Sequence, residues 1–322
     1  MLDCLGRQIH YLRLSITDRC NLRCRYCMPN GVNKCAHEDL LSYEDMEKVV
    51  RALAELGIDT VRLTGGEPLV RRDVEVLLKM IKEIPGIQKV SMTTNGVLLK
   101  QKLPLLLENG LDSVNISLDT LDENKFKQIT GYSLLHNVME GIEAAIESKI
   151  SVKINCVPQI GINDQELIDI AMLAKDWPIE VRFIEIMPIG EGNEKNGINN
   201  EKLFLQFQEK LGMMNKVEHR DGNGPAVCYR VNGFRGSIGF ISAMHGKFCG
   251  ECNRIRLTSK GFLKCCLASN SGADLRELLE QNVSLEQLKE VLSDTIYHKP
   301  IEHHFEIPGK TTEKNGMYAI GG

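Results

Sequence analysis

Residues Tyr11–Pro29 read YLRLSITDRCNLRCRYCMP, and this stretch decides the fold. Its first part, Tyr11–Thr17, is a short run typical of a β-strand. Its second part holds three cysteines in the spacing C-x3-C-x2-C. The sequence therefore predicts a group of thiols at the end of a strand.

The same unit, a short strand followed by a helical stretch, recurs through the first part of the chain. The predicted strands are Tyr11–Thr17, Thr60–Thr64, Lys89–Thr93, Ser113–Leu118, Ser151–Val157 and Glu180–Met187. Amphipathic segments predict helices at Tyr43–Leu56, Asp73–Ile84, Leu98–Glu108, Leu134–Ser148 and Asp164–Lys175. Ser42 is a predicted N-cap, and Gly57 and Gly110 are predicted C-caps. Such alternation predicts parallel strands joined by crossover helices, which fits an open doubly wound sheet or a barrel equally well.

Motifs that carry chemistry follow the predicted strands. The cysteine group follows the first strand, GGEP (65–68) the second, TTNG (93–96) the third and SLD (117–119) the fourth. In both candidate folds, ligands bind at the carboxyl ends of the strands. Glycines also allow a backbone to approach a ligand closely. We therefore expect these motifs to line one site.

The regular alternation of predicted strands and helices ends after Met187. We expect a loop at Pro188–Asn200, a helix at Asn200–Leu211, and strands at Ala226–Val231 and Phe234–Ser242. A second cysteine group comes next, followed by two helical segments from about Ala273 to Tyr297 and the ending MYAIGG. The prediction is thus a region of alternating strands and helices at 1–190 and a further region at 191–322.

Composition limits the function classes. The chain has 322 residues, a formal net charge of −4 and 11 cysteines. This charge disfavours a nucleic-acid binder but is compatible with a local basic pocket for a phosphorylated small molecule. No apolar run is long enough to cross a membrane, and the start of the chain lacks a signal-peptide pattern, so we expect a cytoplasmic protein without a membrane partner. Disulfides are disfavoured in that compartment, so clustered cysteines predict metal or cluster ligation.

The first cysteine group consists of Cys20, Cys24 and Cys27. A [4Fe–4S] cluster normally takes four cysteines, so three leave one iron open to an outside ligand. S-adenosylmethionine (SAM) can chelate that iron through its amine and carboxylate, and electron transfer then gives a 5′-deoxyadenosyl radical. A zinc knuckle or free thiols are the alternative. The aromatic Tyr26 before the last cysteine, and GGEP one strand later, favour the cluster.

The second group consists of Cys249, Cys252 and Cys266 in the spacing C-x2-C-x13-C. Cys265 is adjacent to the third ligand, and neighbours on a strand point to opposite faces, so only one of the two should ligate. Three thiols again indicate an open site. A structural zinc ribbon, with His245 as a fourth ligand, remains the alternative.

Basic residues on the predicted strands suggest an anionic ligand. Arg254 and Arg256 alternate and therefore project to one face, where they suit phosphate or a purine acceptor. A solvated basic edge is the ordinary explanation for such a pair. Arg13, Arg62 and Lys153 also lie on strands that lead to the predicted site. Five converging cations would imply a highly charged ligand such as a triphosphate.

Nearly end to end, the sequence resembles the GTP 3′,8-cyclase family of molybdenum cofactor biosynthesis, within the radical SAM superfamily. The motifs that carry the resemblance are DCLGR, LRLSITDRCNLRCRYCMP, VRLTGGEPLVRRD, TTNG, VNISLD, VKIN, RFIEIMP, GFIS, FCGECNRIRLT and the final GG. The resemblance implies an incomplete (β/α)6 barrel of the TIM type, closed by a C-terminal α+β region that carries a second iron–sulfur cluster.

The resemblance also implies cofactors and residue roles. Two [4Fe–4S] clusters are implied. Cys20, Cys24 and Cys27 would hold the cluster that cleaves SAM. Cys249, Cys252 and Cys266 would hold an auxiliary cluster whose open iron contacts the guanine of GTP. SAM would contact Tyr26, Gly66, Ser117 and Met187. GTP would contact Arg13, Arg62, Thr93, Lys153, Arg254, Ile255 and Arg256, and catalysis would require Gly321 and Gly322 together with Arg254 and Arg256.

The implied reaction removes hydrogen from C3′ of the GTP ribose and joins C3′ to C8 of the guanine. The implied partners are a reductant protein such as flavodoxin or ferredoxin and a downstream cyclic pyranopterin monophosphate synthase, with the chain a monomer or a homodimer. Two features depart from the family pattern: the stretch AMHGKFC (243–249) and the Cys265–Cys266 doublet. The competing hypotheses are another radical SAM enzyme with an auxiliary cluster, such as a peptide maturase, and a zinc-binding interaction protein.

Overall fold

One strongly curved sheet is the frame of the molecule. A computed structural model describes residues 1–28, 31, 39–190, 196–217, 224–307, 311–313 and 315–321, and within these ranges twelve strands form a single sheet. Six parallel strands follow one another in sequence order: β1 (Tyr11–Ser15), β2 (Thr60–Thr64), β3 (Lys89–Thr94), β4 (Ser113–Ser117), β5 (Ser151–Cys156) and β6 (Glu180–Ile184). The predicted parallel α/β arrangement is confirmed.

The C-terminal part extends this sheet at both ends. Beyond β1 it adds β10 (Arg254–Leu257), β11 (Phe262–Lys264) and β12 (Gly272–Asp274), and beyond β6 it adds β9 (Ser237–Ile241), β8 (Val227–Val231) and β7 (Met214–Val217). β10 and β9 pair in parallel with β1 and β6, whereas the outermost pairs are antiparallel. The hydrogen-bonded order runs from β12 to β7 without returning on itself, so the barrel is incomplete.

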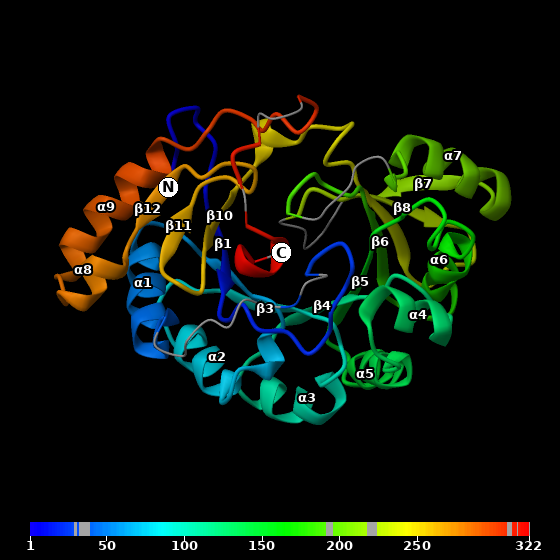
Figure 1. The fold of residues 1–322 in the computed structure, drawn as a ribbon, viewed down its shortest axis with the longest axis horizontal. Helices are drawn as coiled ribbons and strands as arrows, with labels where there is room; N and C mark the ends of the chain where they lie inside the picture. The colour runs from blue at the N-terminus through cyan, green and yellow to red at the C-terminus, as the bar shows by residue number, and fades with distance from the viewer. Residues whose placement is uncertain are drawn as a thin grey trace.

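Helices cover the outside of the curve, and the last described residues lie inside it (Figure 1). The helices are α1 (Tyr43–Glu55), α2 (Val74–Lys82), α3 (Leu99–Glu108), α4 (Glu123–Thr130), α5 (Leu135–Glu147), α6 (Leu167–Asp176), α7 (Asn200–Leu211), α8 (Arg276–Glu280) and α9 (Leu285–Tyr297). The Ser42 hydroxyl accepts a hydrogen bond from the Asp45 amide at 3.0 Å, as predicted for an N-cap. Gly57 and Gly110 adopt the positive φ predicted after helix ends. No described helix is long and apolar enough to cross a membrane.

Alternation along the strands separates an apolar outer face from a polar inner face. Leu12, Leu14, Val61 and Leu63 are fully buried in the core between sheet and helices. Their neighbours face the inside of the curve, and the register aligns Arg256, Arg13 and Arg62 across three adjacent strands. Side chains on a strand alternate between faces, so this pattern makes the interior polar where most barrels pack branched apolar side chains.

Several predicted elements differ from the structure at their ends. The strand predicted to reach Met187 ends at Ile184, and the helix predicted from Asp164 begins at Leu167. Ala273, predicted to begin a helix, lies in β12, and the two helices that follow begin at Arg276 and Leu285. Helix α4 and strands β7, β11 and β12 were not predicted. The helix has eight residues and the strands three or four, too few repeats for periodicity to identify an element reliably.

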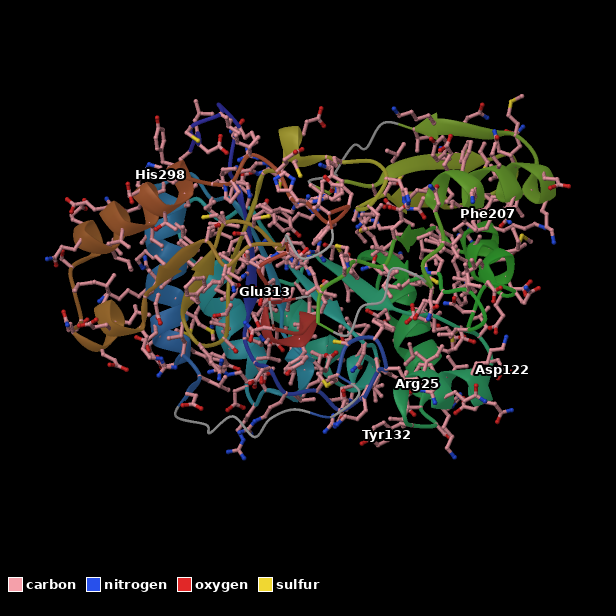
Figure 2. The ribbon with its side chains drawn as sticks, turned by 45° about the horizontal axis from the view of Figure 1, so that its top comes forward. Arg25, Asp122, Tyr132, Phe207, His298 and Glu313 are labelled. Carbon is pink, nitrogen blue, oxygen red and sulfur yellow. The ribbon has the colours of Figure 1, made fainter. Side chains whose placement is uncertain are left out.

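An aromatic cluster fixes α7 against the extended sheet. The rings of Phe183 and Phe207 lie 5.0 Å apart in an edge-to-face arrangement, and Phe240 contacts Phe183, Phe204 and Phe207. Phe207 is 1% exposed, and Figure 2 labels it in this packed layer. The cluster therefore ties the chain after β6 back onto β6 and β9.

We expect Phe207→Ala to lower the free energy of unfolding by about 3–5 kcal/mol, because it removes a large side chain from a packed core and leaves a cavity. Urea unfolding followed by circular dichroism measures this loss. Leu205→Ala is the control, since Leu205 lies on the same helix but is 59% exposed, and it should cost less than about 0.5 kcal/mol. Equal effects of the two substitutions would contradict the assignment.

Candidate active site

A cavity of about 390 Å³ lies inside the curve of the sheet, and both cysteine groups line it. The thiols of Cys20, Cys24 and Cys27 come from the loop after β1, and those of Cys249, Cys252 and Cys266 come from the segments around β10 and β11. The motifs that follow β2, β3 and β4 also reach this cavity through Gly65, Gly66, Thr93 and Ser117. The structure thus brings together the strand-end motifs and the second cysteine group.

The first cysteine loop is tied to the end of β4 by Tyr26. The Tyr26 hydroxyl donates a 2.7 Å hydrogen bond to Asp119, whose other carboxylate oxygen accepts one from the Val157 amide at 2.8 Å. Burial, followed by the charge of Asp119, raises the pKa of Tyr26 well above its usual value, so the ring keeps its proton. Asp119 therefore fixes the aromatic side chain that stands between Cys24 and Cys27.

GGEP packs on the backbone that precedes the cysteines. A Cβ atom added to Gly65 would lie 2.3 Å from the Thr17 carbonyl oxygen, and one on Gly66 would lie 2.4 Å from that of Arg19. The Gly66 and Glu67 amides donate to the same two carbonyls, each at 2.8 Å. The structure shows that these glycines approach the backbone of the cysteine loop as well as lining the cavity.

Glu67 ties GGEP to the end of β3. Its carboxylate accepts hydrogen bonds from the Thr94 hydroxyl at 2.7 Å and from the Leu69 and Asn95 amides. Burial raises the pKa of Glu67 to about 7, and the three hydrogen bonds oppose that rise. The side-chain Nδ2 of Asn95 in turn lies 3.7 Å from the Cys20 sulfur.

The two thiol groups differ in their electrostatic surroundings. Burial raises the pKa of Cys20, Cys24 and Cys27, in the last case to about 12. Burial alone would also raise the pKa of Cys252, but the charges of Lys299 and Arg254 lower it to about 7. The first group must therefore lose protons on binding iron, whereas the second contains a thiol that nearby cations already favour as thiolate.

The Cys265–Cys266 doublet divides between two environments. The Cys265 thiol is 3.1 Å from the Thr295 carbonyl in α9 and packs in the main core. Cys266 instead packs against the small cluster of Ile189, Ala268, Phe305 and Ile320, although both cysteines line the cavity. This placement favours Cys266 over Cys265 as the third thiol of its group.

Two histidines near the second group have different positions. His245, the suggested fourth zinc ligand, has a 58% exposed side chain that contacts the Glu185 carboxylate at 3.0 Å. His303 lines the cavity, and its Nε2 has no hydrogen-bond partner within the part of the chain that the structure describes. Among these described residues, no three Cys, His, Asp or Glu side chains are grouped to hold a single metal ion.

Cations line the wall between the two thiol groups. Arg13, Arg62 and Arg256 lie in register on β1, β2 and β10, and Arg254 and Lys153 line the same cavity. Burial and the neighbouring Arg256 hold the pKa of Arg13 well below its usual value. Burial alone would raise the pKa of Tyr11, but Arg62, Arg13 and Arg254 lower it to about 8, and its hydroxyl accepts a hydrogen bond from Arg62. This concentration of positive charge favours an anionic ligand.

Polar atoms in the cavity wall also lack protein partners. The buried side-chain oxygens of Thr64, Thr93, Asn115 and Asn155 have no hydrogen-bond partner among the described residues, and all four residues line the cavity. Buried polar groups are nearly always paired, so orphaned ones mark places where a ligand or water binds.

The C-terminal tail, described over 311–313 and 315–321, enters this cavity. The Gly321 carbonyl accepts hydrogen bonds from Arg13 at 3.0 Å and from Arg256. Ile320 and Met317 pack with Met187, Ile189 and Phe305 in a small apolar cluster. Gly321 adopts φ +76° and lies so close to Thr64 that a Cβ atom would be 2.7 Å from its hydroxyl, which explains glycine at this position. Gly322 lies outside the described residues.

A buried ion pair anchors the tail. Lys264 in β11 pairs with Glu313, and their side chains are 2% and 0% exposed. Glu313 also accepts a hydrogen bond from the Asn315 amide at 2.6 Å. Figure 2 labels Glu313 near the middle of the view.

Most of the residues singled out from the sequence line the cavity, but some do not, and others were missed. Ile255 is fully buried in the core on the opposite face of β10 from Arg254 and Arg256. Sequence analysis missed Tyr11, Asn115, Asn155, Arg182 and His303, all of which line the cavity. Continuing the alternation that selected Arg13 and Lys153 would have found Tyr11, Asn115, Asn155 and Arg182, because they occupy the same face of their strands.

Comparison with known proteins gives two family matches. Residues 14–174 match the family described as the Radical SAM superfamily, and residues 179–305 match the one described as Molybdenum Cofactor Synthesis C. The chain is 45% identical over 323 residues to a GTP 3′,8-cyclase of Clostridium perfringens (strain 13 / Type A) and 42% identical over 327 residues to one of Clostridium botulinum (strain Okra / Type B1). Both matches cover 100% of each chain.

Solved structures share the fold at lower identity. Streptococcus suis SuiB bound to S-adenosylmethionine gives a TM-score of 0.59 at 16% identity, covering 91% of this chain and 65% of that one. The protein anSMEcpe with bound AdoMet gives 0.57 at 16% identity, covering 92% and 79%. At these identities the likeness shows the fold alone.

We expect Glu313→Gln to loosen the tail, because removing one partner of a buried ion pair leaves Lys264 without its counter-charge, at a cost of about 3–5 kcal/mol. Hydrogen exchange followed by mass spectrometry should show amides of residues 315–321 exchanging at least ~10-fold faster. Glu306→Gln is the control, since Glu306 pairs with Lys247 at the surface. Unchanged exchange in the chain carrying Glu313→Gln would show that the pair does not anchor the tail.

Proposed function

The chain belongs to the GTP 3′,8-cyclase family of the radical SAM superfamily, and from this premise we propose that it converts GTP to (8S)-3′,8-cyclo-7,8-dihydroguanosine 5′-triphosphate. This reaction is the first step of molybdenum cofactor biosynthesis. The observation that carries the proposal is one cationic cavity lined by two separate groups of three cysteines. When bound, SAM and its cluster supply the radical chemistry that removes the C3′ hydrogen of GTP.

The chain's own residues divide between the two cofactor sites. Cys20, Cys24 and Cys27 would hold the SAM-cleaving [4Fe–4S] cluster, with SAM beside Tyr26, Gly66, Ser117 and Met187. Cys249, Cys252 and Cys266 would hold a second [4Fe–4S] cluster that contacts the guanine. The Tyr26–Asp119 hydrogen bond and the packing of GGEP on Thr17–Arg19 support the first assignment, because both fix the cysteine loop.

The triphosphate would bind the cationic wall. Arg13, Arg62, Arg254, Arg256 and Lys153 are the proposed contacts, and Thr93 offers a hydroxyl without a protein partner among the described residues. Guanidinium groups suit phosphate because their donors form a planar fork. Arg13 and Arg256 also donate to Gly321, so GTP and the tail share donors, and each guanidinium has enough of them for both. We propose that Gly321 acts in catalysis through this shared contact, and that catalysis also requires Gly322, which lies outside the described residues.

The remaining assignments concern organisation and partners. We propose that residues 1–190 form the SAM-binding partial barrel and that 191–322 contribute the second cluster, much of the GTP site and the tail. We further propose a reductant protein such as flavodoxin or ferredoxin, a cyclic pyranopterin monophosphate synthase that uses the product, a monomer or homodimer, and a cytoplasmic location. The proposed clusters are sensitive to oxygen and must receive an electron from another protein. These two properties support the proposed reductant protein and the proposed cytoplasmic location.

The test is anaerobic incubation of the reconstituted, reduced chain with SAM and GTP, followed by mass analysis of the nucleotide. We expect a product with the mass of GTP and the fragmentation of a C3′–C8 bond. Cys24→Ala should abolish 5′-deoxyadenosine, because the first cluster loses a ligand. Cys252→Ala should leave SAM cleavage but stop nucleotide conversion, because guanine loses its anchor. Cys4→Ala, at an exposed thiol, is the control and should change neither.

Two outcomes would count against this proposal. Persistent 5′-deoxyadenosine formation by the Cys24→Ala chain would show that SAM is cleaved elsewhere. Unchanged nucleotide conversion by the Cys252→Ala chain would remove the second cluster from the reaction.

A further inference from the structure

The motif DCLGR (3–7) plays no part in the function proposed above, yet it contacts the second cysteine group. Asp3 and Arg7 form a buried ion pair at 2.6 Å, with Gly6 at φ +75° closing the turn between them. The Arg7 guanidinium donates to the Cys249 carbonyl at 3.0 Å and to the Ile301 carbonyl at 2.9 Å. It also donates to the carbonyls of Lys299 and Pro300. Arg7 therefore fixes the backbone of Cys249 to the segment after α9.

That segment places a second cation against the same group. Lys299 is 3% exposed, and its ammonium donates to the Arg254 carbonyl at 2.9 Å and to the Cys265 carbonyl. Arg254 lies two residues after Cys252, and Cys265 immediately precedes Cys266. Lys299 thus joins the strands that carry these two thiols. Each of the three thiol-bearing segments is held by one of two buried cations.

The two cations differ in charge balance. Arg7 has its counter-charge in Asp3. Lys299 forms no ion pair with any carboxylate in the ranges that the structure describes, although it is almost fully buried. Burying a charge without a counter-charge is costly. We therefore infer that an anion binds beside Lys299. Lys299 lines the cavity together with Cys249, Cys252 and Cys266.

We propose that Lys299 supplies the counter-charge of the second cysteine group, and that it and the Asp3–Arg7 pair position the three thiols. This inference rests on the proposed function, in which these thiols hold an anionic [4Fe–4S] cluster. Three thiolates around such a cluster give a net negative charge, and one-electron reduction makes it more negative. A buried cation next to the cluster favours the more negative state and so raises the reduction potential. Lys299 acts as a positioning and charge-setting residue, not as a ligand.

The test isolates the second cluster by replacing Cys20, Cys24 and Cys27 with Ala in the full-length chain. Iron per chain is measured first, and the midpoint potential is then followed by electron paramagnetic resonance during a redox titration. Lys299→Met in this background should shift the equilibrium for reduction at least tenfold towards the oxidised state, a fall of about 59 mV for a one-electron couple. Lys299→Arg should stay near the parent value, because it keeps the charge.

Further variants separate charge from position. Lys299→Gln keeps a donor for the backbone carbonyls but lacks the charge, so the cluster should load normally while its potential falls as in Lys299→Met. Replacing Asp3 by Asn together with Arg7 by Met removes a neutral pair, so iron retention should fall while the potential of the loaded fraction stays near the parent value. Lys289→Met is the control, since Lys289 lies on α9 in surface ion pairs with Glu55 and Glu286.

The outcomes distinguish this inference from the proposed function. If the chain that lacks Cys20, Cys24 and Cys27 holds no iron, the proposed assignment of a second cluster is wrong. If it holds iron but Lys299→Met and Lys299→Gln leave the potential unchanged, the cluster stands and the role of Lys299 is overturned.

Discussion

Positive charge confined inside a half-closed barrel is the constraint on which the rest of the structure depends. Arg13, Arg62 and Arg256 lie on adjacent strands. Burial and the charge of Arg256 lower the pKa of Arg13, and burial and the charge of Arg254 lower that of Arg256 to about 10. Protein partners of these arginines include the Tyr11 hydroxyl and the Gly321 carbonyl. The apolar faces of the same strands pack against helices, and the concentrated positive charge inside favours an anionic ligand.

The tail is the second element that this constraint organises. It contributes a backbone carbonyl to two arginines, and backbone is the only polar group that glycine can offer. Its position is set at a distance by Lys264 and Glu313, a pair that is neutral in sum and therefore adds no charge to the cavity. The apolar cluster of Ile320 with Met187 and Phe305 links the tail to the proposed SAM and second-cluster sites. The last residues thus connect parts of the cavity that the strands alone leave separate.

The two cysteine groups are similar in sequence but not in environment. The first is held by the Tyr26–Asp119 hydrogen bond, by Arg23 donating to the Cys20 carbonyl and by packing on GGEP, and burial raises the pKa of its thiols. The second is surrounded by Lys299, Arg254 and Arg7, and the cations beside Cys252 lower the pKa of its thiol to about 7. Charge around an iron–sulfur cluster affects its reduction potential, so the two clusters of the proposed function would differ in potential.

The sequence by itself determined the parallel α/β architecture, the strand-end position of Cys20–Cys27 and GGEP, and the inward direction of Arg13, Arg62 and Lys153. These features follow from local periodicity and spacing, which a linear pattern records directly. Only the tertiary structure decided how β10–β12 and β7–β9 extend opposite ends of one sheet. The pairing of β10 with β1 across more than 200 residues, and of β9 with β6 past α7 and the β7–β8 hairpin, leaves no local trace in the sequence. The same reason applies to the different packing of Cys265 and Cys266, the Lys264–Glu313 anchor, and the contact of DCLGR and Lys299 with the segments of the second thiols. Each depends on which segments meet in space, and that is set by packing and charge balance summed over the whole fold.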